Sequence, residues 1–223
     1  DERRRQIFDD TGGVDFAHTV DVDGTIWRFR VNVLQQMGRV GLVARRVNNK
    51  IPSFKNLYLP DGLENLCKFS QGMVLLAGVT GSGKSTTIAS MLDWINHNYR
   101  KHILTLEDPI EYTHTQKKGT VNQRELGKDF DTFTNGLRAS LRQAPNVILV
   151  GEMRDRDSVE IALNAAETGH LVLSTLHTTD ASQTLNRILG MFSFEEENQI
   201  RTRLADSLRW IICQRLLPKV GGG

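Results

Sequence analysis

The segment Gly-Val-Thr-Gly-Ser-Gly-Lys-Ser-Thr at residues 78–86 fits the pattern G-x-x-x-x-G-K-[ST]. It follows an apolar run at 73–77 that has the length and composition of a buried strand. Residues 86–95 then carry apolar side chains at helical spacing. Three glycines let the backbone turn with its N–H groups inward, which makes a hollow suited to a polyphosphate at a helix N-terminus. The segment therefore predicts a nucleotide-binding α/β domain.

The residues of this loop are all candidate contacts to a nucleotide. Lys84 is expected to reach the β- and γ-phosphates of ATP, and the Ser85 hydroxyl is expected to ligate Mg²⁺. A chance match in a glycine-containing turn is the alternative, and the flanking strand and helix argue against it. A dinucleotide-binding loop competes poorly because the stretch 81–86 lacks a third glycine. The candidate set is Gly78, Val79, Thr80, Gly81, Ser82, Gly83, Lys84, Ser85 and Thr86.

Composition sets broad limits on the class of protein. The 223 residues are 39% apolar and 24% charged, which suggests one large or two small globular domains. A formal net charge of +2 offers no dominant basic surface, so we expect no nucleic acid partner. Cys67 and Cys213 lie among apolar neighbours, as free thiols in a reducing compartment do. Without a long apolar run or a signal peptide core, the sequence predicts a cytoplasmic protein that is at most peripheral to a membrane.

The first 57 residues differ in pattern from the rest of the chain. A short charged helix is followed by strand candidates at 14–20, 27–33 and 40–46, with Asp23-Gly24 and Met37-Gly38 as turns. These features predict a small antiparallel sheet. The polar segment 48–53 reads as a connector, and a helical pattern resumes at 63–69. We therefore expect one domain over 1–57 and a second over 58–223.

The second domain alternates strand and helix patterns. Alternation of this kind argues for a mainly parallel sheet with helices on its faces. Strand candidates lie at 73–77, 102–106, 147–150 and 171–175, and helical stretches lie at 86–96, 133–142 and 158–166.

Acidic side chains follow two of these strand candidates. In open parallel sheets, ligands gather beyond the carboxyl ends of the strands. Glu152 follows the strand at 147–150 and could hold Mg²⁺ directly or through water, although Gly151 stands where an Asp is usual. Glu107, Asp108 and Glu111 follow the strand at 102–106, and any of them could polarise the attacking water. Spacing does not decide among them, and an ordinary acidic turn is as good an interpretation of the cluster.

Histidines and arginines supply further candidates. His170 and His177 flank one strand candidate and would stand roughly 20 Å apart, too far to share a metal ion. His177 could contact phosphate, although each histidine taken alone is more often a packed or surface residue. An arginine from a neighbouring domain or subunit often completes a nucleotide site. The candidates are Arg28, Arg30, Arg45, Arg46, Arg124 and Arg154, and most of such a set are ordinary surface cations.

The segments GVTGSGKST, ILTLEDPIEYTH, VNQRE, NVILVGEMRD and AAETGHLVLSTLHTTDA resemble, in order and spacing, the secretion ATPase superfamily. The resemblance runs over about 27–218 and is greatest to the type IV pilus retraction ATPases. It implies a RecA-like P-loop ATPase domain, truncated at its C-terminus, after a partial PAS-like α+β domain. It also implies that residues 78–85 form the Walker A loop, Glu152 is the Walker B acid, Glu111 acts in catalysis, and His170 and His177 form a His box.

The resemblance further implies an assembly and a place in the cell. Members of this family form homo-hexamers at the inner face of the bacterial inner membrane, where they act on a pilus platform protein and, indirectly, on pilins. Pilus extension or export ATPases are the rival within the superfamily, and they typically carry a four-Cys zinc module after a Gln-Arg-Leu segment like that at 214–216. Residues 219–223 hold no cysteine, which favours retraction. A scaffold that binds ATP without hydrolysing it is the second alternative, and Gly151 is its one supporting feature.

Overall fold

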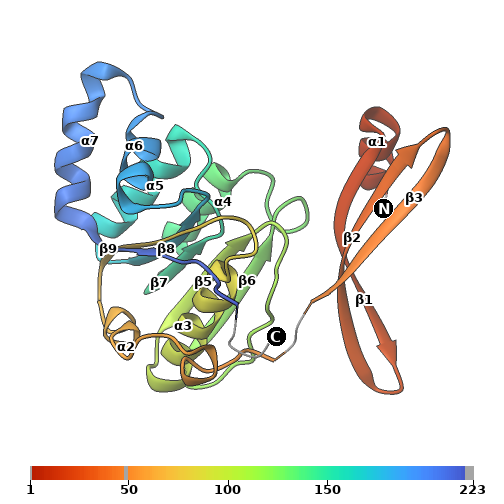
Figure 1. Ribbon diagram of the computed structural model, residues 1–223, viewed down its shortest axis with the longest axis horizontal. Coiled ribbons are helices and arrows are strands. Elements are labelled where there is room, and N and C mark those ends of the chain that lie inside the picture. The colour runs from red at the N-terminus through yellow and green to blue at the C-terminus, as the bar shows by residue number, and fades with distance from the viewer. Residues whose placement is uncertain (1, 48–49, 219–223) are drawn as a thin grey trace. The chain divides into compact units, whose positions relative to one another are not determined.

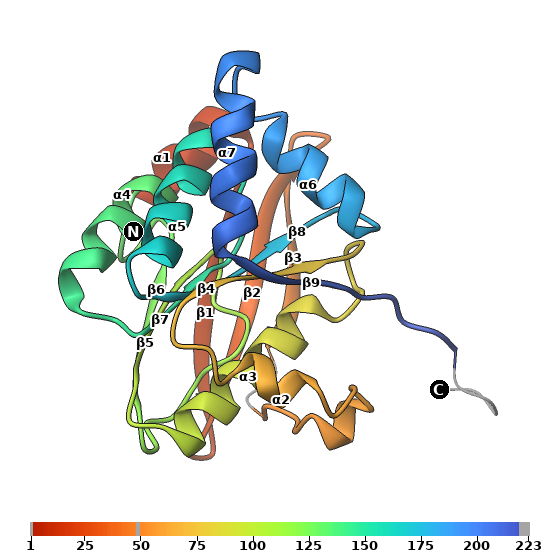
Figure 2. The same ribbon diagram turned by 90° about the vertical axis from the view of Figure 1, so that its left-hand side faces the viewer.

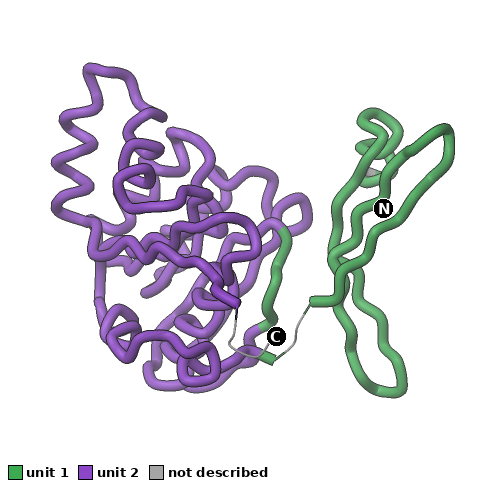
Figure 3. Tube along the Cα trace, viewed as in Figure 1, with its two compact units in different colours: residues 1–50, 109–113 green, residues 51–108, 114–223 purple. Residues whose placement is uncertain are grey.

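The computed structural model describes residues 2–47 and 50–218. The first two residues of the expected connector and the tail at 219–223 therefore lie outside the described residues. The chain divides into two compact units (Figure 3), residues 1–50 with 109–113, and residues 51–108 with 114–223. The sequence places a domain boundary after residue 57, whereas the compact units change at residue 50.

The first unit is a helix followed by an antiparallel meander. Helix α1 spans Glu2–Thr11, and strands β1 (Gly13–Val22), β2 (Thr25–Gln36) and β3 (Arg39–Val47) pair in sequence order. Asp23 and Gly24, and likewise Met37 and Gly38, have positive φ at the two hairpin turns. Such turns match the right-handed twist of the strands that they join. The predicted antiparallel sheet is confirmed.

The second unit contains a six-stranded sheet in the order β6-β5-β7-β8-β4-β9, and every neighbouring pair is parallel. The four predicted strands are confirmed as the four at its centre, β4, β5, β7 and β8. The two outer strands were not predicted from the sequence. The strands are β4 (Gly72–Ala77), β5 (His102–Glu107), β6 (Thr120–Glu125), β7 (Val147–Val150), β8 (Leu171–Leu176) and β9 (Leu208–Cys213).

Helices connect these strands. Three of them, α4, α5 and α6, begin with a Thr or Asp side chain that accepts a hydrogen bond from the backbone N–H three residues later. The pattern at 63–69 forms only a four-residue helix, and the pattern at 133–142 ends in a 3₁₀ turn. The helices are α2 (Leu63–Leu66), α3 (Lys84–Asn98), α4 (Phe133–Ser140), α5 (Arg156–Glu167), α6 (Ala181–Leu189) and α7 (Phe194–Ser207), with 3₁₀ turns η1 (Lys55–Leu57) and η2 (Leu141–Gln143).

Helices cover both faces of the sheet (Figures 1 and 2), and an apolar core lies on each face. Alternate residues of each central strand point to opposite faces. In β4, for example, Met73 and Leu75 pack with residues from α4 to α7, while Val74 and Leu76 pack with residues from α2 and α3. Burial on both faces explains why the central strands read as continuous apolar runs. It also holds the carboxyl ends of the strands in a fixed row.

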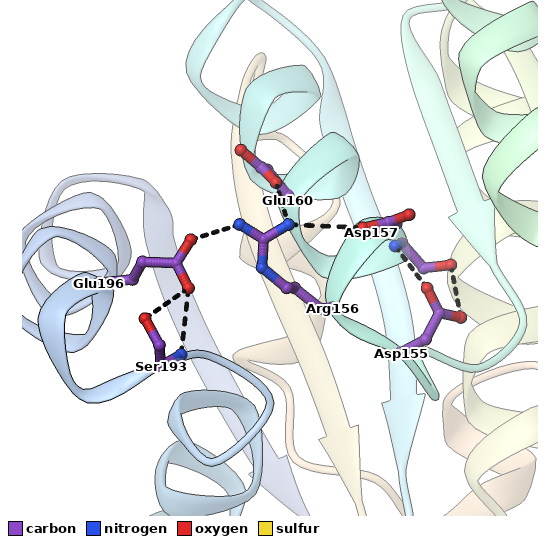
Figure 4. A network of polar contacts seen from close by, with 7 residues as sticks. Asp155, Arg156, Asp157, Glu160, Ser193 and Glu196 are labelled. Atoms are coloured by element: carbon purple, nitrogen blue, oxygen red, sulfur yellow. Dashed lines mark hydrogen bonds and ion pairs between the residues drawn. The ribbon is translucent and has the colours of Figure 1, made fainter.

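Polar contacts join α5 to α7 (Figure 4). Arg156, the first residue of α5, donates a hydrogen bond to Glu196, which also accepts bonds of 3.0 Å from the backbone and the hydroxyl of Ser193. These hydrogen bonds, led by that from Arg156, lower the pKa of Glu196 to about 2. Arg203 on α7 donates to Glu167 on α5 at 2.8 Å. The two helices are therefore linked at both ends of their contact.

Candidate functional site

The glycine-rich loop joins β4 to α3, as the sequence predicts. Gly78, Gly81 and Gly83 have φ of 154°, 81° and 92°, values that residues with a Cβ rarely adopt. Gly83 caps α3 and has no side chain to satisfy the first N–H groups of the helix. Those N–H groups and the helix dipole favour a bound anion at this end of α3.

Lys84 closes over the loop. The side chain is only 7% exposed, and its ammonium group donates hydrogen bonds to Gly78 O at 2.7 Å and Val79 O at 3.1 Å. A cation held beside the N-terminus of a helix, with backbone carbonyls as partners, can transfer its hydrogen bonds to phosphate oxygens. This arrangement is typical of a loop that can bind phosphate.

The remaining loop residues differ in exposure. Val79, Thr80 and Gly81 are exposed, while Ser85 and Thr86 are partly buried. Ser82 is 2% exposed, and its hydroxyl has no hydrogen-bond partner among the described residues. Ser85, the second residue of α3, is partly buried, and its role as a ligand of Mg²⁺ stays a prediction. The described residues contain no group of three His, Cys, Asp or Glu that could hold a metal by itself.

Glu152 follows the end of β7. Neighbouring strands lie about 4.8 Å apart, and only β8 separates β7 from β4, so this acid stands about 10 Å from the start of the loop. Its carboxylate accepts a hydrogen bond from Arg154 Nε at 2.7 Å, and His177 Nε2 lies 3.6 Å from its other oxygen. These contacts hold Glu152 at the edge of the sheet where the loop lies. A metal bound to a nucleotide could be reached through a water molecule.

Gly151 has a structural reason to be a glycine. A Cβ added at this position would lie 3.0 Å from Leu106 O, the same carbonyl that accepts a 2.8 Å hydrogen bond from Gly151 N. Thr175 on β8 also donates to Gly151 O at 2.7 Å. A side chain here would require the Leu106 carbonyl to give by a few tenths of an ångström, so the close packing of β5 against β7 favours glycine at this position.

The acidic cluster after β5 does not converge on one point. Glu107 accepts hydrogen bonds from Thr105 at 2.6 Å and from Gln123 on β6 at 3.1 Å. Asp108 lies 3.9 Å from Arg154 in a loose ion pair. Glu111 belongs to the segment 109–113 of the other compact unit. The structure thus brings Asp108 and Glu152 to one arginine, while the catalytic roles of Glu107 and Glu111 stay predictions.

The two histidines lie at opposite ends of β8. His177 follows its carboxyl end and contacts Glu152. His170 precedes its amino end, where ring Nδ1 and backbone N lie 3.0 and 3.1 Å from Ala165 O. Only His177 lies at the edge of the sheet that carries the loop. A role for His170 at the nucleotide site stays a prediction that this geometry does not support.

The candidate arginines are divided between the units. Arg30 on β2 is paired directly with Arg45 on β3, and both are exposed. Arg46 lies over the ring of Trp27 at 4.9 Å, and Arg124 donates to Asp129 O at 2.6 Å, as structural cations do. The pairing of Arg154 with Glu152 was not predicted from the sequence, although a basic residue two positions after a strand-end acid is a signal that could have found it.

Comparison with known proteins identifies the family. The family model described as type II/IV secretion system protein matches residues 15–221 of the 223. The chain belongs to this family. A crystal structure of the pilus retraction motor PilT with bound ADP has the same fold, with a TM-score of 0.93 and 52% sequence identity. The match covers 100% of this chain and 64% of that chain. The RecA-like fold class predicted from the sequence is confirmed.

Two curated members of the type II/IV secretion family are similar over the whole sequence. The type IV pilus retraction ATPase PilT of Pseudomonas aeruginosa is 44% identical over 222 residues, which cover 100% of this chain and 64% of that protein. A twitching motility protein of Neisseria gonorrhoeae is 43% identical over 221 residues, which cover 99% of this chain and 58% of that protein. The chain thus spans less than two thirds of either relative. Among its described helices, none has the length and apolar character needed to cross a membrane.

Proposed function

We propose that this chain forms the nucleotide-binding part of a type IV pilus retraction ATPase, which hydrolyses ATP to power twitching motility. One observation carries the proposal. The glycine-rich loop at 78–86 precedes the N-terminus of α3, with the Lys84 ammonium bonded to the carbonyl of Gly78, in a chain 44% identical along its whole length to a retraction ATPase. The relative with bound ADP supports a nucleotide as the ligand.

In the proposed reaction, a water oxygen bonds to the γ-phosphorus while the bond from that phosphorus to the β–γ bridging oxygen breaks. The water releases one proton to the solvent, and the products are ADP and inorganic phosphate. The loop N–H groups and Lys84 bind the phosphate oxygens. Ser85 and Glu152 would hold Mg²⁺, which neutralises phosphate charge when bound. Residues 102–114 resemble the acidic segment of the family, in which the acid at the position of Glu111 acts in catalysis, and on that resemblance we assign the orientation of the attacking water to Glu111.

We further propose that the full protein is a homo-hexamer at the cytoplasmic face of the bacterial inner membrane. There it would act on a platform protein and, indirectly, on pilins. Arg30 and Arg45, which are paired on β2 and β3, would together bind an anion. Like charges directly opposite each other destabilise a sheet, so an anion between the two side chains would offset that cost.

The test of hydrolysis is steady-state phosphate release by the full-length protein and by Lys84→Ala. We expect measurable turnover in the wild type and its loss in the variant, because the Lys84 ammonium would be the main positive charge that contacts the phosphates. Lys68→Ala, which removes an exposed cation bonded to Asn65, is the matched control. If none of the three proteins releases measurable phosphate while the wild type still binds nucleotide, the scaffold alternative is favoured and the proposal is overturned.

Retraction and extension are separated in cells. Deletion of a retraction motor leaves pili on the surface and abolishes twitching, whereas deletion of an extension motor leaves cells without pili. We expect the deletion strain to be piliated and non-motile, and complementation with Lys84→Ala to fail. Bald cells would contradict the assignment to retraction.

A further inference from the structure

Gln214, the residue after β9, lies against the residues on either side of the glycine-rich loop. Its backbone N donates to Ala77 O at 2.8 Å and so extends the pairing of β9 with β4 up to the residue that precedes the loop. Its side-chain Oε1 accepts a 2.9 Å hydrogen bond from Thr87 in the first turn of α3. One residue therefore touches both the strand before the loop and the helix after it.

Two of the three loop glycines are shaped by this neighbour. A Cβ added at Gly83 would lie 2.8 Å from Gln214 Nε2, and a Cβ added at Gly78 would lie 2.5 Å from Gln214 O. At Gly81 an added Cβ would meet nothing within 4 Å. Gly81 thus serves the turn alone, while Gly78 and Gly83 also make room for Gln214.

Thr87 and Gly83 are themselves joined. Thr87 N donates to Gly83 O at 2.9 Å, which is the first hydrogen bond of α3 after the loop. Gln214 Nε2 therefore occupies the space that a side chain at Gly83 would fill, while its Oε1 accepts from Thr87, and so the amide lies along the first turn of the helix. The direction of this turn sets the direction of the N–H groups that would face the phosphates.

We propose that Gln214 is a positioning residue for the nucleotide site, because its side-chain amide holds the first turn of α3 at the angle that the phosphates require. The inference rests on the proposed function and adds a residue 127 positions beyond Thr87 to the site. Gln214 acts through the loop and is not a catalytic residue. Its loss weakens nucleotide binding and leaves the chemical step largely intact.

Thr87 offers a sharp test because it is buried, at 1% exposure, and Val has nearly the same shape. Thr87→Val removes the hydrogen bond to Gln214 without opening a cavity, and Thr87→Ser keeps the hydroxyl. Gln214→Met removes the amide at similar volume. Ser90→Ala is the matched control, since Ser90 lies on the same helix and its hydroxyl bonds to Pro52 O at 2.8 Å.

The experiment measures KM and kcat for ATP by phosphate release, and the Kd of a fluorescent N-methylanthraniloyl ADP, in the full-length protein. We expect Thr87→Val and Gln214→Met each to raise KM and Kd about three- to tenfold, as loss of one hydrogen bond does, with kcat within about twofold. The double variant should be no weaker than either single variant, and Thr87→Ser should restore affinity. Ser90→Ala should leave KM unchanged.

Wild-type affinity in Thr87→Val would overturn the proposal, since a packing role is kept by Val. Additive losses in the double variant would overturn it too, because they would mean that the two side chains act separately. These results are read against a wild type that binds the fluorescent nucleotide. Failure of the wild type itself to bind would instead remove the proposed function.

Discussion

Arg154 donates a hydrogen bond from Nε to Glu152 Oε2 at 2.7 Å, and so the acid that ends β7 is paired with a cation only two residues away. The arginine is exposed, which makes the pair weak in free energy. Its effect is to orient the carboxylate, with His177 3.6 Å from the second oxygen. A substitution can therefore remove the charge of Glu152 while it keeps the shape of the side chain and its hydrogen bond from Arg154.

Glu152→Gln is expected to bind ATP and to lose turnover by about 100-fold or more, because the amide oxygen still accepts from Arg154 while the negative charge toward the metal is lost. Phosphate release and the Kd of a fluorescent nucleotide measure the two effects. Glu160→Gln, on the exposed side of α5, is the control. A Glu152→Gln protein with wild-type turnover would remove Glu152 from the site.

Gly83→Ala and Gly81→Ala form a matched pair. Both positions have positive φ, which costs Ala roughly 1 kcal/mol, but only Gly83 also meets Gln214 at 2.8 Å. We expect Gly83→Ala to lower the melting temperature and nucleotide affinity more than Gly81→Ala does. Gln214→Ala should restore part of the loss in Gly83→Ala because it shortens the clashing side chain. Equal effects of the two substitutions would contradict the conclusion that Gly83, unlike Gly81, makes room for Gln214.

Protonation of His114 should make the free energy of unfolding depend on pH. Burial lowers the pKa of His114 from 6.5 to about 4, with Asp93 opposing and Lys117 adding to the shift. Between those pH values the unfolded chain binds the proton more tightly, so the free energy of unfolding falls as pH drops from 6.5 toward 4. This group should cost about 2 kcal/mol at pH 5 relative to pH 7.

Urea unfolding at the two pH values measures this cost, and His114→Gln should reduce the difference between them. His97→Gln replaces an exposed histidine on α3 and serves as the comparison. A difference that is the same in His114→Gln and in the wild type would mean that the buried histidine does not cause it.

Glu196 has two separable roles. It accepts from Ser193 in the capping box of α7, and it pairs with Arg156 on α5. Glu196→Gln keeps the cap and loses the ion pair, whereas Glu196→Ala loses both. We expect the Ala variant to melt at a lower temperature than the Gln variant, with salt reducing only the difference between Gln and the wild type. Melting curves at low and high salt decide the matter, and identical curves for the two variants would exclude a capping contribution.

The sequence alone was sufficient to predict the four central strands of the second unit and its glycine-rich loop. Strands β4, β5, β7 and β8 are buried on both faces, so their apolar runs are visible without a structure. The loop at 78–86 is equally visible, because a tight phosphate-binding turn restricts glycine and lysine to fixed positions within one short segment. These are local requirements, and local residues satisfy them.

Other elements gave weaker signals. Strand β6 lies at the edge of the sheet and is largely polar, so it lacks the apolar run that marks a buried strand. Helix α7 is rich in Glu and Arg, and its contacts to α5 through Arg156 and Arg203 join residues 36 to 40 positions apart. Periodicity within a window does not contain such partners.

The sequence by itself predicted an anion-binding loop at residues 78–86 and acids after the neighbouring strands. The tertiary structure alone decided that Glu107 accepts a hydrogen bond from Gln123 on β6 and that His177, which follows β8, lies 3.6 Å from Glu152. It alone joined Gln214 to Thr87. The physical reason is that a side chain's hydrogen-bond partner depends on strand order, and strand order is a property of the whole sheet.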